Sequence, residues 1–367
     1  MPTPRLTFGR GTALAGMLIA AALLAGCNGR AARITPYPRP GAGQYEQGQN
    51  TMTTRERRAE ESLIRGQQYE AAGDVDAALA EFERAIAINP ELTPAYIKAG
   101  DIYRSRKEYE MAESRYGRAA QIEPGNFDAQ YLHGLVLQLM NRVDESVRAY
   151  LRALAIRPDD FEANMNLGTA YLQLNDPGQA LQFSQRAVRI QPASGPARIN
   201  LGAVYAALDR HEAAVIEYQQ AAELMPTPDP RLLLNLADSL GRIGRHPEMV
   251  ATLEQLVRSD PSSEAYERLG AGFFRMRRYE DAFRAFENSL TINPGYYPAL
   301  NGVAVCRLNQ YLWSGKQDED ALYDAVAALR RSLQIERRQP KIVELLRRYG
   351  SSGSTRATSQ YTGVPTR

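Results

Sequence analysis

The sequence has little of the chemistry that builds metal centres. Its 367 residues include two cysteines, three histidines and one tryptophan. Thiolates and imidazoles are the usual protein ligands of structural zinc and of iron–sulfur clusters. We therefore expect no metal site and no cofactor bound by the folded part of the chain.

An excess of charge of either sign is also missing. The chain has 44 Lys and Arg residues against 42 Asp and Glu residues, a formal net charge of +2. Such a balance creates no global field for holding nucleic acid. No basic run with interleaved aromatic residues occurs either. Nucleic acid is therefore not expected among the partners.

Residues that could form a catalytic centre are missing as well. There is no glycine-rich phosphate loop, no serine nucleophile elbow and no His-Glu-x-x-His pattern. His133 falls at a packing position. His211 and His246 fall in turns on an edge expected to be solvated, without cysteine or acidic partners at ligand spacing. We predict that the protein is not an enzyme.

The N-terminus carries an export pattern. Arg5 and Arg10 precede an apolar stretch over 13–24, which is shorter than the roughly 20 residues of a membrane-spanning helix. The stretch runs into Leu24-Ala25-Gly26-Cys27, which resembles the lipobox of bacterial lipoproteins. This resemblance implies a signal peptide over 1–26, cleavage before Cys27 and acylation of Cys27. An uncleaved anchor with an incidental cysteine is the alternative.

The same resemblance implies a location. Two or three acyl chains anchor a protein stably, so the exported chain would be held at the membrane on the periplasmic, extracytoplasmic side. Asn28 follows the cysteine where an Asp would signal retention in the inner membrane, which favours the outer membrane. The lipid on Cys27 would be the only non-protein group.

Maturation would leave 42 basic and 42 acidic residues, and Cys306 as the only free thiol. No disulfide within the chain could then form, so stability must come from packing. Cys306 lies in the apolar stretch 302–306, where we expect a buried small hydrophobic residue. A reactive thiol is the alternative.

Two segments without helical periodicity flank the centre of the chain. Residues 27–58 are rich in proline, glycine and glutamine, which predicts an extended spacer between the membrane and the folded part, with a helical lead-in from Thr53 as the alternative for its last residues. Residues 350–367 are rich in serine, threonine and glycine, which predicts a disordered tail.

Between these segments the sequence repeats itself with a period close to 34. A small residue recurs at Gly66, Gly100, Gly134, Gly168, Gly202, Ala237, Gly270 and Ala304. A proline follows 24 residues later in each of the first seven units, from Pro90 to Pro294. A mostly aromatic position follows 16 residues after the small one, at Phe82, Tyr116, Tyr150, Ser184, Tyr218, Leu253 and Phe286. These spacings predict two helices of about a dozen residues in each unit, which the small residues allow to approach closely.

This pattern resembles the tetratricopeptide repeat. The resemblance implies an all-α, right-handed superhelical solenoid of about eight helix-turn-helix repeats with a C-terminal capping helix. The repeats would span 59–336, at about 59–92, 93–126, 127–160, 161–194, 195–228, 229–262, 263–296 and 297–336. The eighth contains an insertion over 312–320 that delays its second helix by nine residues. The amphipathic segment 337–349 is the expected cap.

The first helices of such a solenoid line its concave face, and the residue two before the small one points into the groove. Lys98 and Arg268 occupy this position, and so do three consecutive asparagines, Asn166, Asn200 and Asn235. This ladder resembles the groove asparagines of the repeats in O-linked GlcNAc transferases. Amide side chains could pair with the backbone of an extended peptide of any sequence. The alternative is that Asn-Leu-Gly is simply common in this repeat.

Other polar and aromatic residues could add to the groove. Asp101, Asp238, Arg242 and Arg275 lie near it and could tune specificity. Four aromatic residues lie close together in sequence near the eighth unit, and they would form either a second contact patch or core: Tyr296, Tyr297, Tyr311 and Trp313.

These features predict a membrane-anchored scaffold that binds protein or extended peptide partners. Resemblance to lipoproteins of this layout suggests assembly of a pilus, secretion or other envelope complex. The alternative is a non-catalytic activator of an envelope enzyme, such as a cell-wall synthase or a glycosyltransferase. The sequence leaves the oligomeric state open.

Overall fold

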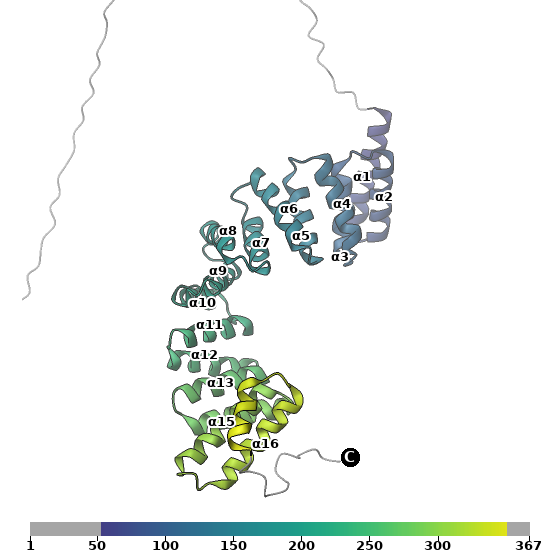
Figure 1. Cartoon of the computed structure of the whole chain (residues 1–367). Helices are drawn as coiled ribbons and strands as arrows, with labels where there is room; N and C mark the ends of the chain where they lie inside the picture. The colour runs from purple at the N-terminus through teal and green to yellow at the C-terminus, as the bar shows by residue number, and fades with distance from the viewer. Residues whose placement is uncertain (1–52, 351–367) are drawn as a thin grey trace, which may run out of the picture. The chain divides into compact units, whose positions relative to one another are not determined.

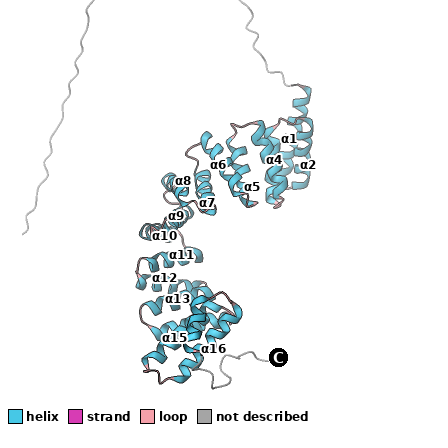
Figure 2. Cartoon of the chain, in the orientation of Figure 1, coloured by secondary structure: helices cyan, strands magenta, loops and turns pink. Residues whose placement is uncertain are grey.

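A computed structural model describes residues 53–350, and all of its regular elements are helices (Figures 1 and 2). The signal peptide, Cys27, most of the spacer and all but the first residue of the tail lie outside this range. The helices are α1 Thr54–Ala71, α2 Val75–Ile88, α3 Thr93–Ser105, α4 Tyr109–Ile122, α5 Phe127–Leu139, α6 Val143–Ile156, α7 Phe161–Gln173, α8 Pro177–Ile190, α9 Gly195–Ala207, α10 His211–Leu224, α11 Pro230–Arg242, α12 His246–Ser259, α13 Ser263–Arg275, α14 Tyr279–Ile292, α15 Tyr297–Trp313, α16 Glu319–Ile335 and α17 Pro340–Tyr349.

The helices pack as eight successive hairpins, from α1·α2 to α15·α16, with α17 on α16. Each hairpin also contacts the next one along the chain. The odd-numbered helices touch their odd-numbered neighbours at α3·α5, α5·α7, α7·α9, α9·α11 and α13·α15. The expected all-α solenoid is therefore confirmed. None of the helices between residues 53 and 350 is long and apolar enough to cross a bilayer.

The close approach of the two helices in a hairpin depends on the small residue of the first. A Cβ atom added to Gly100, Gly134 or Gly202 would lie only 2.6 to 2.7 Å from the ring of the tyrosine on the second helix. Those rings, at Tyr116, Tyr150 and Tyr218, are fully buried. Real Cβ atoms do not approach a ring this closely, so the pair requires glycine at this separation.

The fourth hairpin solves the same packing problem differently. Its second helix has Ser184 where the other hairpins carry a large side chain, and Ser184 is buried beside Gly168. Tyr171 and Phe183 stack there with ring centroids 5.7 Å apart. Aromatic side chains at positions 171 and 183 thus supply the volume that position 184 does not.

Each turn of the first seven hairpins has one residue with positive φ, and the eighth has two, Gly315 and Lys316. The position is filled by Gly73, Lys107, Asn141, Asn175, Asp209, Gly244 and Arg277 in the first seven hairpins. Only two of these are glycine, although a left-handed backbone is costly for other residues. The backbone N–H of the next residue bonds back to the first helix, as from Arg142 to the carbonyl of Leu137, at 2.8 Å. This bond helps hold the tight turn.

The array begins before the expected boundary at residue 59. Helix α1 starts at Thr54, and the Thr53 side chain accepts a hydrogen bond from the backbone N–H of Glu56. The Glu56 carboxylate accepts one in return from the backbone N–H of Thr53, at 2.7 Å. This capping box starts the helix five residues before residue 59, at the place expected for a helical lead-in from Thr53.

The insertion in the eighth hairpin extends helices instead of forming a long loop. Helices α15 and α16 each have 17 residues, against 13 or 14 in the second to seventh hairpins. Asp318 caps α16 by accepting from the backbone N–H of Ala321. Cys306 is buried in α15, as its apolar surroundings predict, and burial raises the pKa of its thiol to about 12.

Changing Gly134 to Ala should destabilise the array. The new methyl group would overlap the Tyr150 ring, which has no room to move, so we expect a loss of about 1–3 kcal/mol in the free energy of unfolding. Gly125→Ala is the matched control, since a Cβ at this turn position meets no atom within 4 Å. Urea unfolding measures both, and equal stabilities would contradict the packing argument.

Candidate functional site

The predicted groove residues all lie on odd-numbered helices. Lys98 is on α3, Asn166 on α7, Asn200 on α9, Asn235 on α11 and Arg268 on α13. All of them are half-buried except Asn235, which is exposed. The repeat spacing therefore places one such side chain at the same point of each of these first helices.

The first two asparagines of the ladder bond to the preceding first helix. The Asn166 amide donates to the Tyr131 hydroxyl on α5, at 3.1 Å. The Asn200 amide donates to the Thr169 hydroxyl on α7, at 3.0 Å. Both amides thus link neighbouring hairpins, and part of their capacity to bind a ligand is already used.

The charged members of the set are engaged in the same way. The Lys98 ammonium pairs with Glu70 on α1 at 2.9 Å. Arg268 pairs with Asp238 on α11. Burial lowers the pKa of the Arg268 guanidinium, but the hydrogen bonds and charges of Asp238 and Glu264 together outweigh burial, so the net shift is upward. These ion pairs also join successive first helices.

Asp101 is engaged within its own hairpin. It accepts a hydrogen bond from the buried Tyr116 hydroxyl at 2.7 Å and pairs with Arg104 at 3.4 Å. Burial raises the pKa of Tyr116, and the Asp101 charge adds to the shift. The proposed tuning residue therefore anchors the hairpin aromatic.

Asn235 differs from the other asparagines because it lines an open hollow. This hollow, called here the arginine pocket, has a volume of about 490 Å³. Helices α9, α10, α11 and α13 supply its walls, which include Tyr218, His211, Asp238, Arg242, Arg268 and Arg275. Three guanidinium groups face one carboxylate there, so the arginine pocket is cationic.

Between residues 53 and 350, two of these arginines form no ion pair, although the charge of Arg275 partly offsets the rise that burial causes in the pKa of the nearby Glu267 carboxyl. Between residues 53 and 350, no side chain forms a hydrogen bond or ion pair with Arg242. Arg275 makes only a long contact of 3.9 Å to the Met249 sulfur. Their donors are therefore free to bind an anion, which charge-assisted hydrogen bonds from arginine favour strongly.

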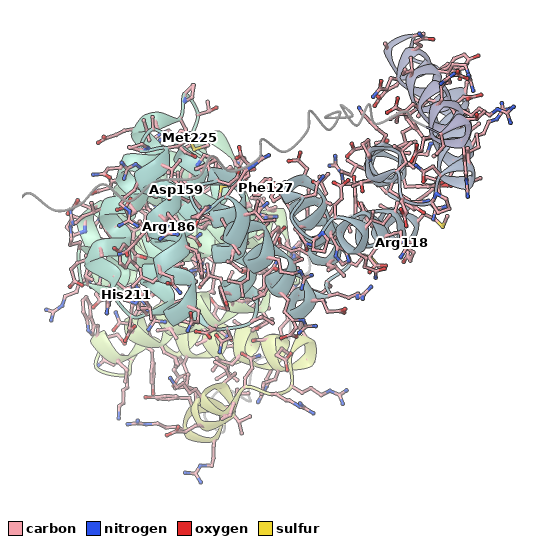
Figure 3. The ribbon with its side chains drawn as sticks, turned by 90° about the horizontal axis from the view of Figure 1, so that it is seen from above. Arg118, Phe127, Asp159, Arg186, His211 and Met225 are labelled. Carbon is pink, nitrogen blue, oxygen red and sulfur yellow. The ribbon has the colours of Figure 1, made fainter. Side chains whose placement is uncertain are left out.

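The Asn235 amide is also without a protein partner in the described range. The Nδ1 atom of His211 is buried without a hydrogen-bond partner and belongs to the pocket wall. Figure 3 labels His211 among the side chains seen from above. The pocket thus combines free cationic and neutral polar groups.

The histidines of residues 53–350 belong to no metal-binding cluster. No three His, Cys, Asp or Glu side chains converge there to hold a metal ion. His211 and His246 begin α10 and α12 and are half-buried, so the expectation of a solvated edge was wrong. Burial lowers the pKa of His133, although Glu113 at 3.3 Å opposes the shift.

The four aromatic residues near the eighth hairpin separate into two groups. Tyr296 and Tyr311 pack against the core. Trp313 is 71% exposed and meets Tyr279 edge-on, with ring centroids 4.9 Å apart. Tyr297 remains 37% exposed. Most of the four residues therefore belong to the core or to its edge, and Trp313 is the only one of them that is widely exposed.

The arginine pocket has a signal in the repeat pattern of the sequence. Arg242 and Arg275 both lie five residues after the small residue of their repeats. The partners of the ladder, Tyr131 and Thr169, occupy two different repeat positions, three before and one after the small residue. Only the packing of neighbouring hairpins identifies those partners.

Asn166→Ala should lower stability more than Asn235→Ala. Both changes give the same gain in helix propensity, but only the first removes a bond between hairpins. We expect a difference of about 1 kcal/mol in the free energy of unfolding. Urea unfolding of both variants measures it, and equal stabilities would show that the Tyr131 bond contributes nothing.

Comparison with known proteins supports the fold and its repeat unit. The Hsp70-Hsp90 organizing protein 2 of Arabidopsis thaliana is 32% identical over 79 residues, which is 21% of this chain and 14% of that protein. The solved pilF structure of Pseudomonas aeruginosa is 19% identical and covers 60% of this chain and 99% of its own, with a TM-score of 0.50. PilW, described as a type IV pilus biogenesis factor, is 21% identical and covers 55% of this chain and 94% of its own, with a TM-score of 0.48. At 19% identity, the likeness to the pilF structure concerns the fold alone.

The family comparison covers most of the array. A model of the tetratricopeptide repeat matches residues 63–129, 131–196 and 234–298, more than half of the chain. A second model of the same repeat matches residues 195–228. The matches follow the helix hairpins and the small–aromatic pairs described above, and the chain belongs to the tetratricopeptide repeat family.

Proposed function

We propose that this protein is a membrane-anchored scaffold that binds an extended segment of a protein partner. Tetratricopeptide solenoids are protein-interaction folds, and the described helices contain no metal-binding cluster that would suggest another role. The arginine pocket is the central observation, because its free groups can recognise a ligand without breaking an internal bond.

The partner segment would present a carboxylate to the pocket. Arg242 and Arg275 can donate to both oxygens of a carboxylate, a geometry that guanidinium groups favour. Asn235 would hold the adjacent backbone, since an amide can donate to a carbonyl and accept from an N–H. Asp238 would remain paired with Arg268, which limits how many acidic groups the pocket accepts.

The anchor would be the acyl group on Cys27, followed by the spacer. The lipobox resemblance of residues 24–27 supports this part of the proposal, and the process served would be assembly of an envelope, pilus or secretion complex. Anchoring holds the array close to membrane-bound partners and so raises their effective concentration. A partner that proves to be an envelope enzyme with altered turnover would favour the activator role.

Photocrosslinking tests the arginine pocket. A benzophenone side chain in place of Arg231, one turn before Asn235 on α11, should crosslink a partner in membranes. The same group in place of Gln255 on α12 should not. Changing Arg242 and Arg275 together to Gln should lower the crosslinking yield about ten-fold, because a carboxylate would lose its cationic partners.

Arg189→Gln with Arg258→Gln is the control for charge. Both residues are exposed on even-numbered helices and make no ion pair in the described range. This pair should crosslink like the unchanged chain. A yield that falls equally in both double variants, or in neither, would reject the arginine pocket as the binding site.

Cys27→Ser tests the anchor separately. The change removes the sulfur that would carry the lipid, so acyl labelling should disappear and the uncleaved precursor should accumulate. Labelling with radioactive palmitate and the mobility of the chain on a gel measure both. Normal processing of this variant would contradict the lipoprotein assignment, but it would not bear on the proposal for the arginine pocket.

A further inference from the structure

The last helices concentrate positive charge in a chain that is otherwise balanced. Residues 330–348 contain seven cationic side chains and only two acidic ones, Glu336 and Glu344. The seven, called here the basic end, are Arg330, Arg331, Arg337, Arg338, Lys341, Arg347 and Arg348. All but Arg331 are exposed.

None of the seven forms an ion pair within residues 53–350. Arg330 donates to the backbone carbonyl of Gly350 at 3.3 Å, and Arg331 to that of Pro294 at 2.9 Å. Glu336 accepts from the backbone N–H of Arg338 at 2.8 Å instead of pairing with a side chain. Arginines without an ion pair also occur elsewhere in the described array, such as Arg242 and Arg275, so the basic end is distinguished by its seven cations against two acids within one short segment.

The packing of α17 on α16 keeps these cations together at the end of the array. Helix α17 packs on α16 through the buried Ile342. The bond from Arg330 to Gly350 places the end of α17, with Arg347 and Arg348, beside α16. Two aliphatic side chains are exposed in the same segment, Ile335 at 47% and Val343 at 51%.

We propose that the basic end docks on an anionic lipid surface. Four to eight Lys and Arg residues clustered on a helix bind anionic headgroups, and each cation near such a surface raises the affinity about five-fold. The exposed aliphatic side chains can enter the headgroup region. The arginine pocket is lined by none of these residues, so the two surfaces are separate.

A lipid surface suits the basic end better than an acidic protein segment does. The cations lie along two helices and a turn, where many headgroups can each contact one cation. A bound peptide would need free polar groups converging on a pocket, as at Asn235. The contact does not depend on an acyl group at Cys27, and it would hold the far end of the array at the membrane.

The test uses the full chain with a reporter inside the basic end. Trp313→Phe with Val343→Trp leaves a single tryptophan, on α17. The chain is mixed with phosphatidylcholine vesicles, with or without about 30% phosphatidylglycerol, that carry a dansyl headgroup. Energy transfer from tryptophan to dansyl is measured per bound chain, with binding determined by flotation.

We expect at least about three-fold more transfer on the anionic vesicles, and loss of this difference at about 0.5 M salt, where screening is strong. Changing Arg330, Arg347 and Arg348 to Gln should bring the ratio close to one. The matched control changes Arg189, Arg210 and Arg258 to Gln and should keep the ratio. These three residues are exposed on other hairpins or their turns and form no ion pair within residues 53–350.

A ratio near one in the reporter chain would overturn the proposal, as would equal loss in both triple variants. A ratio near one together with binding of poly-glutamate in solution would assign the basic end to an acidic protein segment instead. Circular dichroism confirms that each variant keeps its helices. The Cys27→Ser chain run in parallel should give the same ratio, so failure here is distinct from failure of the lipid anchor.

Discussion

The contact between a small residue and a buried ring is the constraint on which the rest of the structure depends. A Cβ at Gly134 would fall 2.7 Å from the Tyr150 ring, so glycine alone permits the separation of the two helices. That separation sets how the next hairpin can pack, because each hairpin contacts the next one along the chain. The position of every groove residue follows from this repeated contact.

The groove residues are consequently bonded to neighbouring hairpins to a larger extent than a row of free amides would be. Asn166 and Asn200 donate hydrogen bonds to the preceding hairpin, and Lys98 and Arg268 form ion pairs with it. Such bonds favour one arrangement of neighbouring hairpins over others. Side chains that are free to bind a ligand are found where this series of internal bonds stops, at Asn235 and at Arg242 and Arg275, which form no ion pair in the described range. A partner that binds there competes with no internal bond.

The chain thereby combines surfaces of different chemistry on one regular scaffold. The arginine pocket is a hollow between hairpins, which suits a carboxylate on a flexible segment. The basic end is an exposed helix pair, which suits an extended anionic surface. Both arise from charges that the array does not pair internally, although the chain as a whole is nearly neutral. Charge balance over the full sequence therefore conceals local imbalance that matters for binding.

The sequence by itself determined the hairpin, its period and its core, because small and aromatic residues 16 apart act through local helical geometry. It also placed Lys98, the three asparagines and Arg268 at one point of successive helices, since that point recurs with the repeat. Only the tertiary structure decided which of them are free. Asn166 and Tyr131 are 35 residues apart in sequence, and their bond exists only when two hairpins pack. The tertiary structure likewise decided that the eighth hairpin has longer helices, because the local free energy of inserted residues is similar whether they continue a helix or form a loop.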